Sequence, residues 1–137
     1  MAKSMQVNIV SAEGEIFAGT ADMVIAPAKL GEVGVAPGHA PMITPLNAGE
    51  VRVQSEGHEE QHIFVSGGML EVQPKVLTVL ADTAIRAADL DEAAAIEAKQ
   101  RAEEALADRK ESMDYAKAQA ELVEAIAQLQ MIRRMKK

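Results

Sequence analysis

The sequence predicts an α+β fold in which an N-terminal antiparallel β-sandwich or barrel precedes a C-terminal antiparallel α-helical hairpin. Every glycine and proline lies at or before Pro74. Because glycine and proline punctuate turns, their absence from residues 75–137 permits long helices. The first part of the chain instead holds many short strand-like runs with close turns and no intervening helix, which is typical of antiparallel sandwiches and barrels. We therefore expect a β domain over residues 1–87 and a helical hairpin over residues 88–137.

The expected strands are short and follow one another closely. Residues Met5–Val10 alternate between apolar and polar side chains, so one face of this strand is apolar. The glycine- and proline-rich stretch Gly31–Pro41 is expected to form a loop, and the strand set is expected to be complete by Ala84. The other expected strands are Glu15–Gly19, Asp22–Pro27, Met42–Leu46, Gly49–Gln54, Gln61–Ser66, Met69–Gln73 and Val76–Ala81.

Two helices are expected in the second half. Asp89 and Glu92 resemble a capping box, with aspartate as N-cap and glutamate at the third helical position. The first helix should end near residues 106–108, the polar residues 108–114 should form the turn, and the second helix should cover about Met113–Arg134. Cations oppose the dipole favourably at a helix C-terminus. The basic residues expected there are Arg133, Arg134, Lys136 and Lys137.

Each expected helix carries a stripe of apolar residues that can face the other helix, and the side chains are smaller on the first helix than on the second. An all-alanine stripe lets helices approach closely, but each alanine methyl contributes only about 0.8 kcal/mol on burial. The hairpin is therefore able to pack and also able to come apart, and a permanently docked helical pair is an equally open reading. The stripe of the first helix is Ala95, Ala98, Ala102 and Ala105, and that of the second is Tyr115, Ala118, Leu122, Ala125, Leu129 and Ile132.

The composition excludes several classes of protein. The formal net charge is −7 and the sequence pI is about 5.0, which disfavours a nucleic-acid clamp because such proteins need a basic face. The chain has no cysteine, so disulfide scaffolds, thiol nucleophiles and cysteine-bound zinc are excluded. No apolar run approaches the ~20 residues that span a bilayer, and we read no secretory signal at the start.

The sequence shows no convincing enzyme active site, metal site or cofactor site. His58 and His62 are expected to be solvated strand histidines, and His39 stands alone in a loop. The glycines of Gly31–Gly38 lack the Lys-Ser/Thr pair of a phosphate loop. Residues Ser66–Gly68 are flanked by strands on both sides, unlike a nucleophile elbow. We therefore expect a non-catalytic protein.

Several strings resemble the epsilon subunit of bacterial F-type ATP synthases. They are V-S-A-E at residues 10–13, G-E-V-G-V-A-P-G-H-A-P at 31–41, V-S-G-G-M-L-E-V at 65–72 and V-L-A-D-T-A at 79–84. The resemblance covers essentially the whole chain. It implies an N-terminal sandwich and a C-terminal helical hairpin, in agreement with the division by composition.

The resemblance also implies a place and a role. Members of this family lie in the central stalk, on the cytoplasmic face of the inner membrane, and bind the gamma subunit and the c ring. They help to couple proton flow to ATP synthesis, and their C-terminal helices can extend toward the alpha and beta catalytic subunits and inhibit ATP hydrolysis. The chain is accordingly expected to be peripheral to the membrane and to need no cofactor.

Particular residues carry these expectations. The family's acidic contact with the c ring corresponds to Glu32, with His39 nearby. Physically, an acidic loop residue can pair with cationic loop residues of a partner. The basic end of the second helix, with Arg133 and Arg134, is expected to meet an acidic surface of the catalytic subunits.

The sequence departs from the family at the nucleotide motif. Members that bind ATP carry I/L-D-x-x-R-A where the first helix starts, but here Leu90 and Asp91 are followed by Ala94 in place of arginine. Among the other arginine positions of the motif, only Arg101 is an arginine in this sequence. The arginine positions expected on the second helix hold Glu124 and Gln128. Alanine cannot replace the charged fork that binds phosphate. A nucleotide sensor is therefore the weaker alternative to a rotor subunit, and an unrelated adaptor is weaker still.

Overall fold

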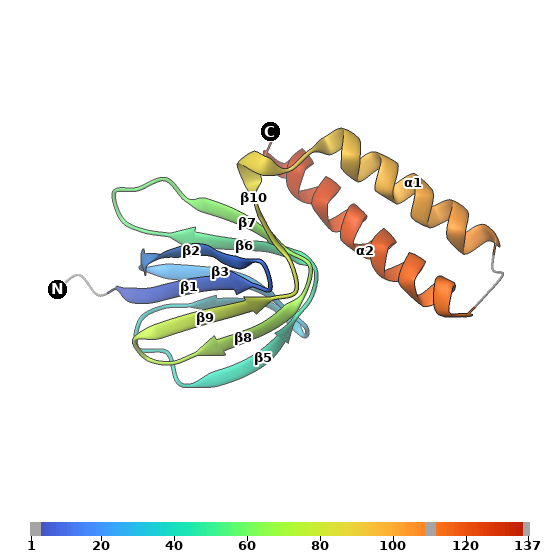
Figure 1. The fold of residues 1–137 in the computed structure, drawn as a ribbon. Coiled ribbons are helices and arrows are strands. Elements are labelled where there is room, and N and C mark those ends of the chain that lie inside the picture. The colour runs from blue at the N-terminus through green and yellow to red at the C-terminus, as the bar shows by residue number, and fades with distance from the viewer. Residues whose placement is uncertain (1–3, 109–111, 136–137) are drawn as a thin grey trace. The chain divides into compact units, whose positions relative to one another are not determined.

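The computed structural model describes residues 4–108 and 112–135 (Figure 1). The chain forms two compact units, residues 1–88 and 89–137. The first contains the strands and a 3₁₀ turn that continues to Asp89, and the second contains two helices. The strands are β1 Met5–Ser11, β2 Gly14–Ala21, β3 Met23–Ala28, β4 Gly31–Val35, β5 Met42–Leu46, β6 Gly49–Gln54, β7 Gln61–Val65, β8 Gly68–Val72, β9 Val76–Ala81 and β10 Ala84–Arg86.

The strands form one continuous sheet that folds over into a sandwich with a barrel-like path. Its order is β10-β7-β6-β3-β5-β8-β9-β1-β2, and β4 pairs with β3. Strand β3 shares one edge between two partners, because Met23–Ile25 pair with β6 while Ala28 pairs with Leu46 of β5. At the two ends of the path, Nε and Nη2 of Arg86 in β10 donate to the carbonyl oxygen of Ile16 in β2.

The expectation of a wholly antiparallel domain is wrong at one pairing. Strands β1 and β9 are parallel, with Val7 opposite Leu77 and Ile9 opposite Val79. Both strands are buried on alternate residues, so β1 completes the core beside a strand far away in sequence. The other pairings among the described residues are antiparallel, as expected.

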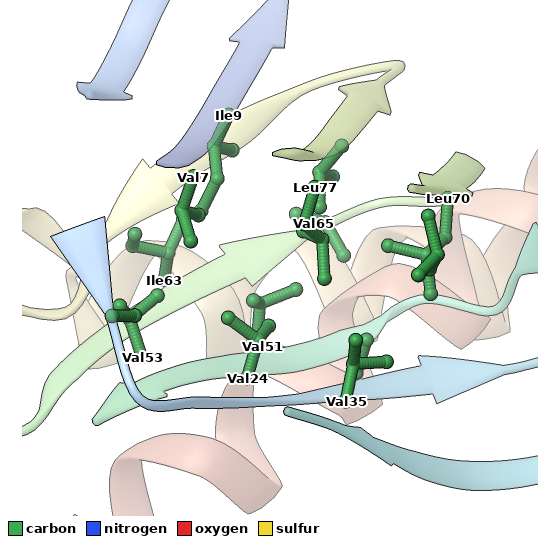
Figure 2. Close-up of a cluster of buried hydrophobic side chains, with 14 of the residues drawn as sticks. Val7, Ile9, Val24, Val35, Val51, Val53, Ile63, Val65, Leu70 and Leu77 are labelled. Atoms are coloured by element: carbon green, nitrogen blue, oxygen red, sulfur yellow. The ribbon is translucent and has the colours of Figure 1, made fainter. Parts of the chain in front are cut away.

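The core lies between the two layers of this sheet. Side chains from β1, β8 and β9 face side chains from β3, β4, β6 and β7 (Figure 2). Valine, isoleucine and leucine dominate because the chain has almost no aromatic residues. The fully buried members include Val7, Ile9, Val24, Val35, Val51, Leu70, Leu77 and Val79.

Two strands lie where none was expected. Gly31–Val35 forms β4, because its backbone pairs with β3 through a tight hairpin in which Ala28 faces Gly31 and Val24 faces Val35. Gly31 and Gly34 therefore lie within a strand, and only the later part of the stretch is a loop. Strand β10 extends the set to Arg86 and pairs with β7, so the set is not complete by Ala84.

The helices are α1, Glu92–Asp108, and α2, Ser112–Met135. The expected capping box is wrong, because Asp89 ends a 3₁₀ turn over Ala87–Asp89. The N-cap is Asp91, whose Oδ1 accepts a hydrogen bond of 3.2 Å from the backbone N–H of Ala94. The expected turn was too long, because Asp108 and residues 112–114 are helical. Residues 109–111 lie outside the described residues.

Helices α1 and α2 pack against each other. Ala95, Ala102, Ala118 and Ala125 are buried, as the stripe pattern predicts. The stripe prediction is wrong at Ala105 and Tyr115, the members nearest the connection between the helices, which are exposed, but it is confirmed at Leu129 and Ile132, which are buried. The buried part of the hairpin is therefore shorter than the pattern suggested.

Candidate functional site

Glu32 lies in the exposed first part of strand β4 and pairs across the hairpin with Pro27 of β3. Its carboxylate Oε1 lies 3.1 Å from Nη2 of Arg52, a residue of β6. The Glu32 side chain is 53% exposed and that of Arg52 is 29% exposed. The carboxylate is thus accessible from solvent while a guanidinium contacts it from the sheet.

Arg52 belongs to a chain of charged contacts that sequence reasoning missed. Its Nε lies 3.9 Å from Oε1 of Glu50, and Oε2 of Glu50 lies 3.0 Å from Nδ1 of His62. The other ring nitrogen of His62 lies 3.2 Å from Oε1 of Glu60. His62 is therefore held between carboxylates and is not simply a solvated strand histidine. We call Glu32, Arg52, Glu50, His62 and Glu60 the charged network.

His39 lies in the loop that follows β4. It is half-buried, and its Nδ1 lies 2.7 Å from the carbonyl oxygen of Ala40. The preceding Gly38 has a φ of +88° and donates its N–H to Pro74 at 2.8 Å, which anchors the loop. In the described part of the chain no hydrogen bond or ion pair joins His39 to Glu32, so the two expected contact residues are held independently.

An apolar row crosses the outer face of the other layer. The register places Val10 beside Leu80, Leu80 beside Met69 and Met69 beside Pro45. Their chain neighbours point into the core, so these side chains point outward. Leu80 is 52% exposed, and Ile43 on β5 is 67% exposed. We call Val10, Leu80, Met69, Pro45 and Ile43 the apolar row.

A groove of about 460 Å³ lies between α1 and α2. It brings together four positions of the nucleotide motif that sequence analysis singled out. Its full lining is Ala94, Ala95, Ala98 and Arg101 from α1, with Glu121, Glu124, Ala125 and Gln128 from α2. Leu90 lies outside this lining, and Asp91 serves as the helix cap.

The electrostatics of the groove oppose an anionic ligand. Among the described residues that line it, Arg101 is the one cation, against the carboxylates of Glu121 and Glu124. Burial, and then the neighbouring charge of Glu121, raise the pKa of Glu124 above its usual value. A triphosphate would add negative charge to a site that already disfavours it.

Arg133 and Arg134 lie in the last turn of α2 and are exposed. Lys136 and Lys137, also expected at this basic end, lie outside the described residues. Within residues 4–108 and 112–135, no cluster of acidic and histidine side chains could hold a metal ion. The helices in the same described residues include no candidate for a membrane-spanning segment.

Two family models match consecutive parts of the chain. The ATP synthase delta/epsilon chain β-sandwich domain matches residues 4–87, and the delta/epsilon chain long α-helix domain matches residues 88–133. The chain belongs to the ATP synthase delta/epsilon chain family. The recognition made from the sequence strings and the expected order of sandwich and helical hairpin are thus confirmed.

Curated relatives place the chain with the epsilon members of this family. It is 64% identical to the ATP synthase epsilon chain of Nitrosococcus oceani over 137 residues, which cover 100% of this chain and 98% of that relative. It is 61% identical to the ATP synthase epsilon chain 1 of Methylococcus capsulatus, with the same coverage.

Solved structures share the fold at low sequence identity. A chain in the mitochondrial ATP synthase of Euglena gracilis, a structure described as OSCP/F1/c-ring, matches with a TM-score of 0.80 and 17% identity. The match covers 90% of this chain and 78% of that one. A chain in the central stalk/c-ring structure of Tetrahymena thermophila ATP synthase matches with a TM-score of 0.61 and 10% identity, covering 95% and 97%.

Proposed function

We propose that this chain is a non-catalytic central-stalk subunit of a bacterial proton-translocating F-type ATP synthase. It helps to couple proton flow to ATP synthesis and restrains ATP hydrolysis through its C-terminal helices. The observation that carries the proposal is the match of both family domains, in order, along one chain. The origin of the structural neighbours in ATP synthase assemblies, one described as central stalk/c-ring, supports it.

In this proposal the sandwich, residues 1–87, contacts the c ring through Glu32 and His39. Glu32 is accessible and carries a negative charge on a strand next to a loop, which suits a cationic polar loop of the partner. His39 contributes from the anchored loop that follows the same strand.

The gamma subunit docks on the apolar row of the same domain. Several apolar side chains in register on one sheet face form a surface that gains free energy when a partner covers it. The row lies on the layer opposite to the charged network, because it is built from β1, β9, β8 and β5 while the network lies on β4, β6 and β7 with their connecting loop. The two partners would therefore use different surfaces of one domain.

The hairpin, residues 88–137, is the regulatory part. Each buried alanine of its stripe contributes little area, although α2 also buries Leu129, Met131 and Ile132. In this proposal the folded-back and extended states are close enough in free energy for a partner to shift the population. In the extended state the basic end with Arg133 and Arg134 meets the alpha and beta catalytic subunits. The chain is held on the cytoplasmic face of the inner membrane only through these partners, binds no nucleic acid and uses no cofactor.

Nucleotide sensing by the hairpin is not part of the proposal. The groove between α1 and α2 is lined by residues at the positions of the family's nucleotide motif, but the charges of these residues oppose a triphosphate. Calorimetry of the full chain with ATP is expected to show no binding at micromolar concentrations.

The proposal is tested by replacing Glu32 in the assembled complex. We expect Glu32→Lys to lower the number of protons pumped per ATP hydrolysed, because like charges placed together at an interface can cost several kcal/mol. Folding should change little, since an exposed pair contributes about 0–1 kcal/mol. Glu59→Lys is the matched control, because Glu59 is an exposed residue outside the charged network. Normal pumping with Glu32→Lys would remove the proposed c-ring contact.

A further inference from the structure

The pair between Glu32 and Arg52 runs diagonally over strand β3. Arg52 lies opposite Ile25 of β3, whereas Glu32 lies opposite Pro27. Both of these β3 residues are apolar, and Gly34, the β4 partner of Ile25, has no side chain. In this part of the sheet, Glu32 is therefore the acidic side chain that the Arg52 guanidinium meets across β3.

An isolated surface pair of this kind would not fix the orientation of Glu32. Exposed ion pairs contribute little, in part because two long side chains lose conformational freedom when they pair. Arg52 differs from an isolated partner because it is contacted at two points. Its Nη2 hydrogen-bonds Glu32, whereas its buried Nε has no hydrogen-bond partner among the described residues and is approached by the Glu50 carboxylate at 3.9 Å.

Glu50 is in turn held in place. Its side chain is only 5% exposed, and its Oε2 lies 3.0 Å from Nδ1 of His62. His62 lies directly opposite Arg52 in the β6–β7 pairing, and its second ring nitrogen faces Glu60. These neighbours limit the conformations of the Arg52 side chain, whose guanidinium points toward β4. Arg52 therefore loses less conformational entropy when it pairs with Glu32.

We propose that Arg52 is a positioning residue that orients the Glu32 carboxylate for its cationic partner. This inference rests on the proposed contact between Glu32 and the c ring. A carboxylate has about four acceptor sites on its two oxygens. The Arg52 contact uses Oε1, so further acceptor sites of Glu32 stay available to a second cation.

The alternative to positioning is competition, in which Arg52 occupies the Glu32 carboxylate and hinders its binding to the partner. Competition predicts that removal of Arg52 tightens binding of the chain to its complex, whereas positioning predicts that removal weakens it. Positioning also predicts that Arg52 acts only through Glu32. Its removal should then have no effect once the Glu32 carboxylate is gone.

The test is a double-mutant cycle on the full chain. Dissociation constants are measured for ATP synthase stripped of this subunit, with wild type, Glu32→Gln, Arg52→Gln and the double variant. We expect Arg52→Gln to weaken binding about 2- to 5-fold in the wild-type background and by a factor of about 1 in the Glu32→Gln background. Lys75→Gln, which removes one exposed positive charge from a loop, is the matched control.

The outcomes distinguish the positioning role of Arg52 from the proposed contact between Glu32 and the c ring. Tighter binding by Arg52→Gln, unchanged binding, or the same loss in both backgrounds would overturn positioning while leaving the Glu32 contact intact. Unchanged binding and normal pumping by Glu32→Gln would instead overturn the proposed contact itself. Thermal melting of each isolated chain identifies a folding defect. If Arg52→Gln melts early, Arg52→Lys is carried through the same cycle, where the loss of the guanidinium fork should weaken binding in the wild-type background only.

Discussion

Gly68 lies at one of the closest backbone approaches in the sandwich. Its φ is +132°, and a Cβ at this position would lie 2.1 Å from the carbonyl oxygen of Leu80. Neither the conformation nor the space admits a larger residue. The glycine pair of the S-G-G string is thus explained by the turn into β8, in agreement with the structural role expected from the sequence.

Replacing Gly68 should therefore destabilise the chain strongly. We expect Gly68→Ala to lower the free energy of unfolding by about 2–4 kcal/mol, from backbone strain together with the clash. Chemical denaturation of the full chain measures this loss. Gly57→Ala is the control, because Gly57 also has a positive φ but nothing lies near its added methyl. A similar loss for both variants would attribute the effect to φ alone.

The residues of the charged network show what a single sequence can reveal about a site. Glu32 is predicted to be a contact residue because it stands in a recognisable string. Glu50, Arg52 and His62 were not, because charges that alternate with valine on a strand look like an ordinary solvated face. The pairing of β6 with β7 sets His62 opposite Arg52, and this register depends on tertiary structure.

At the scale of the element, the local sequence predicts the two helices best and the glycine-rich stretch 31–41 worst. The absence of breakers located α1 and α2 within a few residues. Strand β4 was missed because glycine normally weakens strands, and here tertiary pairing with β3 overrides that preference. The parallel partnership of β1 with β9 joins segments about seventy residues apart, which no local pattern encodes.

The hairpin should respond to pH through Glu124. Its folded-state pKa is raised by burial and by Glu121, so the charged form is less favourable in the folded hairpin than in the unfolded chain. This destabilisation is present at neutral pH and is relieved as the pH falls through the raised pKa. We expect Glu124→Gln to raise the melting temperature at pH 7 and to have less effect near pH 4.

Melting curves followed by circular dichroism across this pH range check the prediction. Glu97→Gln, a change at an exposed residue of α1 outside the groove, is the control. A gain that is equal at both pH values, or equal for the two variants, would show that the Glu124 charge is not disfavoured in the folded hairpin.

At the scale of the whole molecule, the chain combines two units with unequal cores. The sandwich buries a contiguous cluster of mostly branched aliphatic side chains. The helices bury four alanines, with larger buried side chains only on α2 among the described residues, at Leu129, Met131 and Ile132. Burial of apolar area is the main favourable term in folding. On this ground we expect the sandwich to be the more stable of the two units.

The central claim is that the hairpin restrains ATP hydrolysis while the sandwich attaches the chain to the rotor. The most direct measurement is the ATP hydrolysis rate of the assembled complex with the full chain, with a chain ending at Asp108, and with a chain ending at Ala88. We predict that all three remain bound to the complex and that both truncated forms hydrolyse ATP faster than the full chain. Equal rates for the three, with all three bound, would contradict the regulatory role of the hairpin, and loss of the chain ending at Ala88 from the complex would contradict attachment by the sandwich.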